Sequence, residues 1–493
     1  EFALFDDEQA LCIAQEVLAE EKGKKKGREF LRELSLKKAG VEKEWTKEFL
    51  DAYDRYQNKL EEEGLLDYDD LLIKTLEAVR EGAMDETWRK HFTYLCVDEF
   101  QDMNPVQYEL VKLWNEKGRE LFVIGDKDQA IYGFRGSNAA CFDWLKKEFE
   151  DLEVLKLEKN YRSTPEILSA ALHVISNNSG EERTLEANEK SGEKVRIVKA
   201  KSSMAEAIFI AKEINRLAGG IGMLEAQKVR ESGQEKKERG FDEIAVLYRT
   251  HRQAQMLEQC LGQEGIPCVV AGREDFLKEE SVSGSIHFFD CLEDKENIHA
   301  KEMCQKQLFH LEKNELFEEV FARLWERFHE EYRKKKPQKF LKLWMEEMNL
   351  TEDPSMQRLF EMAVFYESMP KFLEGLKLGV ESDLKRCQGK AYESGAVTLM
   401  TLHGAKGLEF PVVFVCGLQK GILPLEHGKF AVDEEEERRL FYVGMTRARE
   451  ELILTCQGEE SAFLLELPEE VIVKEEADKK KKQEDMHQMS LFE

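Results

Sequence analysis

The chain has 493 residues, a length that exceeds one hydrophobic core and predicts two or three domains. Charged residues make up 35% of it. No run of about 18 uncharged apolar residues occurs, so we expect a soluble protein without a membrane-spanning segment. The net charge of −27, taken alone, argues against a nucleic-acid partner, because phosphate binding needs Lys and Arg. Any nucleic-acid site must therefore be a local basic and aromatic groove within an acidic surface.

The ten cysteines are scattered without a CxxC pair or a Cys/His cluster. Several lie in apolar runs, such as Cys96 in TYLCVDEF and Cys416 in VVFVCGL. This pattern predicts free core thiols in a reducing cytoplasm and disfavours zinc or iron–sulfur ligands.

Residues 1–62 are rich in Lys, Glu, Leu and Ala, and apolar residues recur at helical spacing from Phe49 to Leu60, which predicts a helical subdomain. Residues 63–158 contain short apolar runs that end in polar loops. These runs are FTYLCVDE (92–99), LFVIGD (121–126) and VLKLEKN (154–160). With helical stretches between them, they predict buried parallel strands of an α/β sheet, whose carboxyl ends bind ligands.

A second set of apolar runs predicts a second α/β domain, divided between residues 159–274 and 395–460. The runs are VRIVKA (195–200), EIAVLYR (243–249), AVTLMTLH (396–403), PVVFVCG (411–417) and ELILTC (451–456). Residues 275–394 interrupt this set with amphipathic sequence and predict an inserted helical subdomain. Residues 225–240 predict a charged loop or solvated helix, and residues 461–493 a charged tail that is disordered over 474–487.

The segment VDEFQD places Asp98 and Glu99 directly after an apolar run. Two adjacent acids at the end of a buried strand are costly unless they hold a cation or polarise a water molecule. In P-loop ATPases an Asp in this position holds Mg²⁺, and a neighbouring acid or Gln orients the attacking water. The alternative for these two residues alone is a helix cap or a pair of loop acids.

A second apolar run leads directly into GDKDQAIYGFRGS, residues 125–137. Its glycines permit tight turns, Gln129 can reach a γ-phosphate, and three side chains can stack on bases: Tyr132, Phe134 and Arg135. Stacking contributes roughly 1–3 kcal/mol per base and works for any base sequence. The alternative, that the two aromatic residues belong to a core, is disfavoured by the Gly and Arg residues around them.

Five segments resemble, in chain order, motifs II to VI of the superfamily 1A helicases, the UvrD/Rep type. They are VDEFQDMNPVQ, GDKDQAIYGFRGS, LEKNYRST, VTLMTLHGAKGLEFPVVFVCGL and EEERRLFYVGMTRARE, and LDYDDLL (66–72) resembles the family segment before motif II. The resemblance implies an α/β fold with two RecA-like parallel-sheet motor domains, the first incomplete, each with a helical insertion. It also implies ATP-dependent 3′-to-5′ movement on single-stranded DNA and DNA junctions in repair or replication, with ATP and Mg²⁺ between the domains.

The resemblance assigns roles to individual residues by their motif positions. Those assigned to the nucleotide are Asp98 for Mg²⁺, Glu99 as the general base, Gln129 as γ-phosphate sensor, Tyr161 on adenine, Arg162 on the phosphates, Arg447 as arginine finger, and Gly407 and Glu409 as nucleotide contacts. Those assigned to DNA are Tyr132, Phe134, Arg135, Arg249, Thr401 and His403. A guanidinium beside the transferred phosphoryl group can contribute ~10³–10⁵ in rate.

The chain departs from the family in one essential feature. A complete motor carries GxxxxGK[ST], whose backbone amides cradle phosphates, and no GKS or GKT occurs here. The resemblance implies that upstream family residues are missing, so we expect the chain as given to hydrolyse ATP negligibly. The alternative is an ATPase-inactive DNA-binding or scaffold protein, which the retained acids and arginines disfavour.

The last residues, KKKKQEDMHQMSLFE, end in a short apolar peptide: Gln488, Met489, Ser490, Leu491 and Phe492. This peptide resembles the pentapeptide by which bacterial replication and repair proteins dock on the sliding clamp. Leu491 and Phe492 can fill an apolar pocket, while the Gln488 amide fixes the register. The alternative is an ordinary frayed tail.

Overall fold

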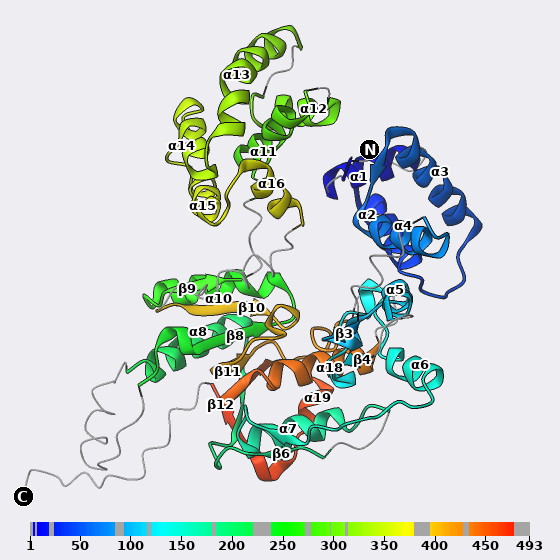
Figure 1. The fold of residues 1–493 in the computed structure, drawn as a ribbon. Coiled ribbons are helices and arrows are strands. Elements are labelled where there is room, and N and C mark those ends of the chain that lie inside the picture. Colours follow the sequence, from blue (N-terminus) through cyan, green and yellow to red (C-terminus); the bar gives the residue numbers. More distant parts are fainter. Residues whose placement is uncertain are drawn as a thin grey trace, which may run out of the picture. The chain divides into compact units, whose positions relative to one another are not determined.

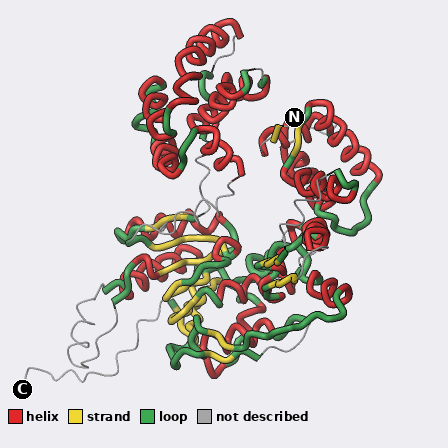
Figure 2. The backbone as a smooth tube through the Cα atoms, in the orientation of Figure 1, coloured by secondary structure: helices red, strands yellow, loops and turns green. Residues whose placement is uncertain are grey.

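The computed structural model describes residues 3–4, 7–18, 24–83, 93–115, 120–179, 184–219, 238–271, 277, 279–295, 297–310, 314–378, 395–426 and 433–477. The chain divides into two compact units. The first comprises Glu1–Val269 and Ser394–Glu493, and the second Val270–Glu393. Figure 1 shows helices and strands in the first unit, and Figure 2 shows helices over the described part of residues 279–378.

The amino-terminal helices enclose a small aromatic core. They are α1 (Asp7–Val17), α2 (Lys24–Lys38) and α3 (Lys47–Glu63), followed by α4 (Tyr68–Arg80), and the short strands β1 (Ala3–Leu4) and β2 (Leu65–Leu66) pair in parallel. Ala52, Tyr56 and Leu60 form the buried face of α3, which confirms the helical spacing read from the sequence. Thr46 caps the helix by accepting a hydrogen bond from the Phe49 amide at 3.2 Å.

The first predicted sheet consists of two parallel strands, β3 (Tyr94–Val97) and β4 (Glu120–Val123). One face, with Leu95 and Val123, packs on the core formed with α5 (Pro105–Asn115) and α6 (Cys141–Glu148). The other face is open, with Tyr94 62% and Phe122 54% exposed. The prediction of buried strands is therefore wrong for this face, because the helices that the structure describes cover only one side of the sheet.

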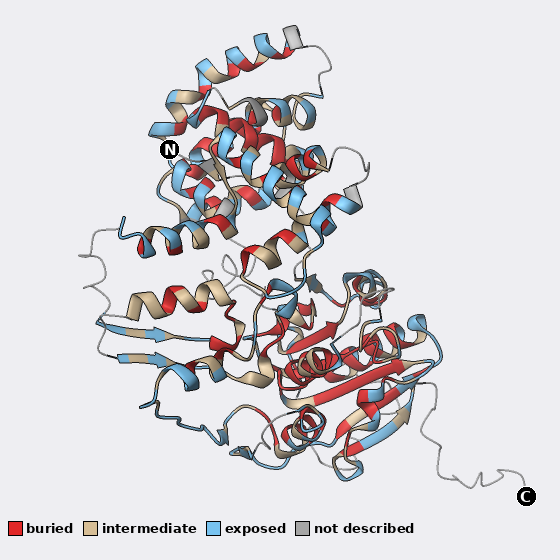
Figure 3. Ribbon diagram, turned by 90° about the vertical axis from the view of Figure 1, so that its right-hand side faces the viewer, coloured by how far each residue is buried: buried red, intermediate tan, exposed pale blue. Residues whose placement is uncertain are grey.

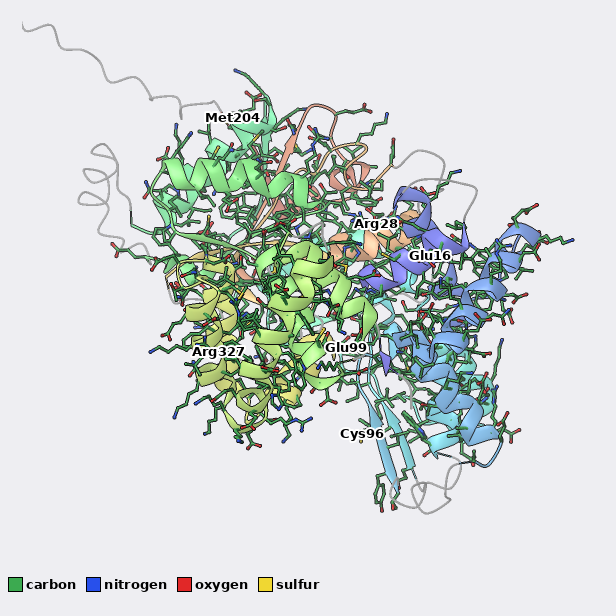
Figure 4. All side chains as sticks on the ribbon, turned by 90° about the horizontal axis from the view of Figure 1, so that it is seen from above. Glu16, Arg28, Cys96, Glu99, Met204 and Arg327 are labelled. Atoms are coloured by element: carbon green, nitrogen blue, oxygen red, sulfur yellow. The ribbon has the colours of Figure 1, made fainter. Side chains whose placement is uncertain are left out.

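Two further predictions for this region are corrected. Cys96 lies on β3 (Figure 4) and is exposed, so it is not a core thiol, whereas Cys416 is buried as predicted. Of the predicted strand 154–160 only β5 (Lys159–Asn160) is in a sheet, paired with β6 (Glu186–Ala187). The preceding Leu157 is exposed, because no described strand pairs with that stretch.

The second predicted sheet has seven strands and confirms the α/β class. Its order is β13 (Ile472–Glu476), β7 (Val195–Ala200), β12 (Ala448–Gln457), β11 (Phe410–Val415), β8 (Ile244–Tyr248), β10 (Val397–Thr401) and β9 (Cys268–Val270). The pairings from β13 through to β10 are parallel. Every residue of β8 is buried, as a central parallel strand requires. Figure 3 shows buried strands and helices of this region in red.

Helices that pack on or beside this sheet come from several parts of the first unit. Three contact its strands: α7 (Pro165–Ile175), α8 (Ser203–Leu217) and α18 (Glu434–Met445). Beside them, α10 (Ala254–Gln263) packs on α8, and Phe463 of α19 (Ala462–Leu465) stacks on Phe441 of α18. Strand β13 corrects the prediction that the charged tail begins at residue 461. Its buried Ile472 and the ion pair between Glu475 and Arg196 of β7 bind this segment to the sheet edge. Residues 220–237 and 478–493 lie outside the described residues.

The second unit has an aromatic core of its own. Its helices are α11 (Glu280–Glu293), α12 (Ile298–Gln307), α13 (Asn314–Lys334), α14 (Pro337–Glu347), α15 (Pro354–Met362) and α16 (Met369–Leu378). Phe288 and Trp344 stack with their ring centroids 4.6 Å apart, and the Trp344 indole donates to the Ser285 hydroxyl at 2.9 Å. No helix among the described residues is long and apolar enough to cross a bilayer.

A buried acid ties the sheet to the loop that follows β11. Glu206 of α8 accepts hydrogen bonds from the Thr455 hydroxyl at 2.6 Å and the Gly417 amide at 2.9 Å. Burial raises the pKa of this carboxyl, although both hydrogen bonds oppose the shift. The folded state therefore binds more protons than the unfolded state over the range between the two pKa values, and stability falls as the pH rises through that range.

Glu206→Gln should consequently change the free energy of unfolding by an amount that depends on pH. The amide oxygen keeps an acceptor for both donors without carrying a charge, so the stability of the variant relative to wild type should increase as the pH rises above the ordinary pKa of a glutamate. Urea unfolding of both proteins at several pH values measures this difference, with the exposed Glu264→Gln as control. A difference that is the same at every pH would contradict the assignment of a raised pKa.

Candidate active site

Asp98 and Glu99 follow β3, and both are exposed. Exposure removes the cost of burial that the sequence suggested for these acids. Asp98 Oδ1 accepts a hydrogen bond from the Glu99 amide at 2.8 Å. Glu99, labelled in Figure 4, has a φ of 51°, in the left-handed region that residues other than Gly rarely adopt. Such a conformation is held by its surroundings and is common at functional sites.

The buried side chain of Gln101 supplies part of those surroundings. Its amide nitrogen donates to Glu99 Oε2 at 2.5 Å, and its oxygen accepts from the Asp126 amide at 2.9 Å. A Cβ atom at Gly125 would lie 2.5 Å from this oxygen, so only Gly fits there. Gln101 thus connects the segment after β3 with the segment after β4. Sequence reasoning missed this residue, although it lies within the same motif as the two acids.

Gln129 ends the short helix η3 (Lys127–Gln129), which begins after Asp126. Asp126 Oδ2 accepts a hydrogen bond from Gln129 Nε2 at 2.8 Å, and Oδ1 accepts from the Asp128 amide at 3.0 Å. The carboxylate therefore fixes both the turn and the orientation of the Gln129 side chain.

Lys406 connects this region to the seven-stranded sheet, and sequence reasoning also missed it. It lies between β10 and β11, is buried, and places its Nζ 2.5 Å from Asp102 Oδ2 and 3.5 Å from Glu99 Oε2. The same nitrogen donates to the Gln129 carbonyl at 2.9 Å. Burial raises the pKa of Asp102 although Lys406 opposes the shift. Loss of a buried partner of this kind leaves an uncompensated charge.

Two arginines lie close together near these acids. Arg447 is almost completely buried and donates to the carbonyls of Val443 at 2.9 Å and Leu408 at 3.2 Å. Burial, followed by the nearby Arg162 charge, lowers the pKa of Arg447 to about 10. Arg162 donates to Glu409 Oε2 at 2.6 Å. The predicted nucleotide contacts from three distant segments therefore lie together.

Two other predicted nucleotide contacts adjoin this cluster in sequence. Tyr161 is 65% exposed, so its ring is accessible for stacking. Gly407 has a φ of 80°, a conformation that favours Gly. Both observations are compatible with the predicted roles.

These residues fit a nucleotide and its divalent ion. The charges of Arg162 and Arg447 disfavour each other, and a polyanion would relieve that repulsion. Asp98 and Glu99 offer oxygens of the kind that Mg²⁺ binds together with water and phosphate oxygens. The described residues contain no group of three or more His, Cys, Asp and Glu that could hold an ion alone. Lacking GxxxxGK[ST], the chain also lacks that motif's backbone cradle for phosphates.

The predicted DNA contacts form an aromatic cluster built from two segments. Phe134 is 47% exposed and meets His403 edge to face, with ring centroids 5.5 Å apart. Tyr132 lies 6.3 Å from the same ring, and Arg135 lies over both Tyr132 and Phe134 at 5.6 Å. Burial, then Arg249 and Arg135, lowers the pKa of His403 to about 4. The histidine is therefore neutral at neutral pH and contributes no cation.

Thr401 and Arg249 are engaged within the protein. Thr401 Oγ1 accepts a hydrogen bond from the Gly404 amide at 3.1 Å and so stabilises the turn after β10. Arg249 donates to both oxygens of the buried Glu437, at 2.7 Å and 3.1 Å. A DNA phosphate would have to share or replace that ion pair. The predicted clamp contacts Gln488, Met489, Leu491 and Phe492 lie outside the described residues.

Comparison with protein families identifies both halves of the chain. Residues 6–150 match the model of the UvrD/REP helicase N-terminal domain. Residues 155–346 and 304–459 match that of the UvrD-like helicase C-terminal domain.

Curated relatives agree with these matches. The ATP-dependent DNA helicase PcrA of Bacillus subtilis (strain 168) is 30% identical, with 86% of this chain and 64% of that protein covered. The ATP-dependent DNA helicase Rep of Buchnera aphidicola subsp. Acyrthosiphon pisum is 29% identical, with 86% and 74% covered. PcrA of Leuconostoc citreum is 31% identical, with 82% and 60% covered.

The chain therefore spans 64% of the length of the first of these relatives. The C-terminal family model alone matches more than half of the chain, over residues 155–459. These matches confirm the resemblance read from the motifs and accord with RecA-like motor domains. The chain belongs to the UvrD/REP-like helicase family.

Proposed function

We propose that the protein to which this chain belongs is an ATP-dependent DNA helicase that moves 3′ to 5′ along single-stranded DNA in repair or replication. The observation that carries the proposal is the convergence of charged groups from distant segments. Lys406 contacts Glu99 and Asp102, and Arg162 contacts Glu409 beside the buried Arg447. The direction of movement and the cytoplasmic location rest on the resemblance and on composition.

We assign each of these side chains a separate role in nucleotide hydrolysis. Glu99 Oε2, oriented by Gln101, is placed to accept a proton from water, while Asp98 offers an oxygen to Mg²⁺. Arg162 and Arg447 bind and orient phosphate oxygens, and Gln129 responds to the terminal phosphate. The bound nucleotide supplies the phosphoanhydride whose hydrolysis drives movement. Tyr161 stacks on its adenine base and Glu409 contacts the nucleotide, while Gly407 keeps the loop before Glu409 tight.

We assign the aromatic cluster of Tyr132, Phe134 and His403 to single-stranded DNA, together with Arg135, Thr401 and Arg249. Aromatic faces and a guanidinium bind unpaired bases without regard to sequence. Residues 63–158 and 159–460, the latter interrupted by 275–394, are the corresponding motor domains in this proposal.

For this activity the protein needs a GxxxxGK[ST] loop, which we expect outside the 493 residues of this sequence. The alternative is an ATPase-inactive DNA-binding or scaffold protein that docks on the sliding clamp. The reading frame upstream of Glu1 discriminates between them, because a GxxxxGK[ST] segment supports the motor and a start codon near Glu1 supports the scaffold.

In the complete protein, Glu99→Gln should leave nucleotide binding nearly unchanged and reduce DNA-stimulated turnover to background, because it removes only the proton acceptor. Phosphate release and binding of a fluorescent nucleotide measure the two effects separately. Glu62→Gln, at an exposed position of α3, is the matched control. Normal turnover by Glu99→Gln would show that the general base lies elsewhere.

Phe134→Ala and Tyr132→Ala should each weaken single-stranded DNA binding by roughly 1–3 kcal/mol, and equally for all base sequences, because each removes a stacking surface. Fluorescence anisotropy with homopolymeric and mixed oligonucleotides measures the loss. A loss confined to one base sequence would indicate readout of base edges instead.

We also propose that the terminal peptide docks on the sliding clamp. A peptide of residues 479–493 should bind purified clamp in a calorimetric titration, with Leu491 and Phe492 filling an apolar pocket. The same peptide with Leu491→Ala and Phe492→Ala should not bind. Equal binding by the two peptides, or none by either, would mean that the tail has another role.

A further inference from the structure

Glu436, in the first turn of α18, reaches the loop that carries the proposed DNA contacts. Its Oε1 accepts a hydrogen bond from the Gly133 amide at 2.9 Å, across 303 positions of sequence. Gly133 begins the short helix η4 (Gly133–Arg135), which contains Phe134 and Arg135. The contact therefore joins the loop directly to a helix of the other motor segment.

The loop fits closely around this carboxylate. A Cβ atom at Gly133 would lie 2.6 Å from Glu436 Oε2, so no larger residue fits while Glu436 keeps its position. On its other side the loop packs through Gly136, whose φ is 85° and where a Cβ atom would lie 2.9 Å from Ala39 Cβ. The Gly133 contact thus fixes one end of the aromatic loop, residues Tyr132–Arg135. The Gly136 contact fixes the other end.

The helix that carries Glu436 ends beside the arginine cluster. α18 has 12 residues, so it is about 18 Å long, and it ends at Met445, two residues before Arg447. Its amino end is capped by Asp433, which accepts from the amides of Glu435 and Glu436. A packed helix of this length can shift as one rigid element, so a displacement at its first turn would also move its last turn.

We propose that Glu436 is a positioning residue that holds the DNA-contacting loop Tyr132–Arg135 in place and couples it, through α18, to Arg447. This inference rests on the proposed function and adds to it a residue that touches neither nucleotide nor DNA. It predicts an effect opposite to simple electrostatics, under which removing an acid beside a DNA site tightens binding.

The test is binding of a fluorescent oligo(dT) of about 16 nucleotides to the 493-residue chain. Glu436→Ala should weaken binding about ten-fold, the effect of losing one hydrogen bond to a charged group. Glu436→Gln keeps an acceptor oxygen and should restore most of the affinity. Glu434→Ala removes an equal charge from the same turn, where the carboxylate pairs only with Arg438 of the same helix among the contacts described, and should not weaken binding.

A second variant tests the same contact from the other side. Gly133→Ala should weaken binding as Glu436→Ala does, and combining the two should cost little more than either alone, because they remove one interaction. Additive losses, equal defects in Glu436→Gln and Glu436→Ala, or tighter binding by Glu436→Ala would overturn the inference. If Phe134→Ala bound oligo(dT) with the same affinity as the wild-type chain, the assignment of the loop to DNA, on which the inference rests, would be overturned instead.

Discussion

The first turn of α18 holds more separate segments of the first unit than any single strand pairing does. Four successive side chains in the first two turns bind several segments that are distant in the sequence, and Glu435 and Arg438 share the segment at Asn178 and Ser179. Glu435 binds the Ser179 amide, Glu436 the Gly133 amide, Glu437 Arg249 and the Leu425 amide, and Arg438 Asn178 and Glu466. Unpaired amides and the helix dipole stabilise negative charge at a helix amino end, which permits acids to accumulate there. Segments more than 250 positions apart are joined through this one turn.

Most strands of the larger sheet could be predicted because each is marked by a short apolar run in its own sequence. β8, β10 and β11 are largely apolar and buried, as strands covered on both faces must be. β7 and β12 carry charged residues as well, but their buried positions also form apolar runs. β13 resembles a solvated tail because only its first two residues are apolar and three charged residues follow at a sheet edge. The apolar runs of β3 and β4 indicated strands correctly, but whether a face is covered depends on helices elsewhere in the chain.

For the candidate site, the order of the motifs identified many of the site residues. The hydrogen-bond and ion-pair partners of those residues could not be predicted from the sequence. Asp98, Glu99 and Gln129 stand out because acids and amides follow apolar strands. Lys406 and Glu436 do not, since their partners lie 304 and 303 positions away and no periodic pattern links them. Gln101 is intermediate, since its motif was recognised but its role depends on a side chain that turns inward. Arg249 was assigned from the family resemblance, yet Glu437 occupies its guanidinium.

The acidic composition and the proposed DNA site are reconciled by where the acids lie. Two carboxylates near the aromatic loop form ion pairs inside the protein: Glu437 with Arg249, and Asp102 with Lys406. A carboxylate that is paired at short range contributes little to the potential felt by a DNA phosphate beyond its partner. Distant surface acids contribute little as well, since salt screens charges beyond about 8 Å under physiological conditions. The net charge of −27 is therefore a property of the whole chain. The electrostatic potential at the proposed DNA site is set mainly by Arg135 and its immediate neighbours.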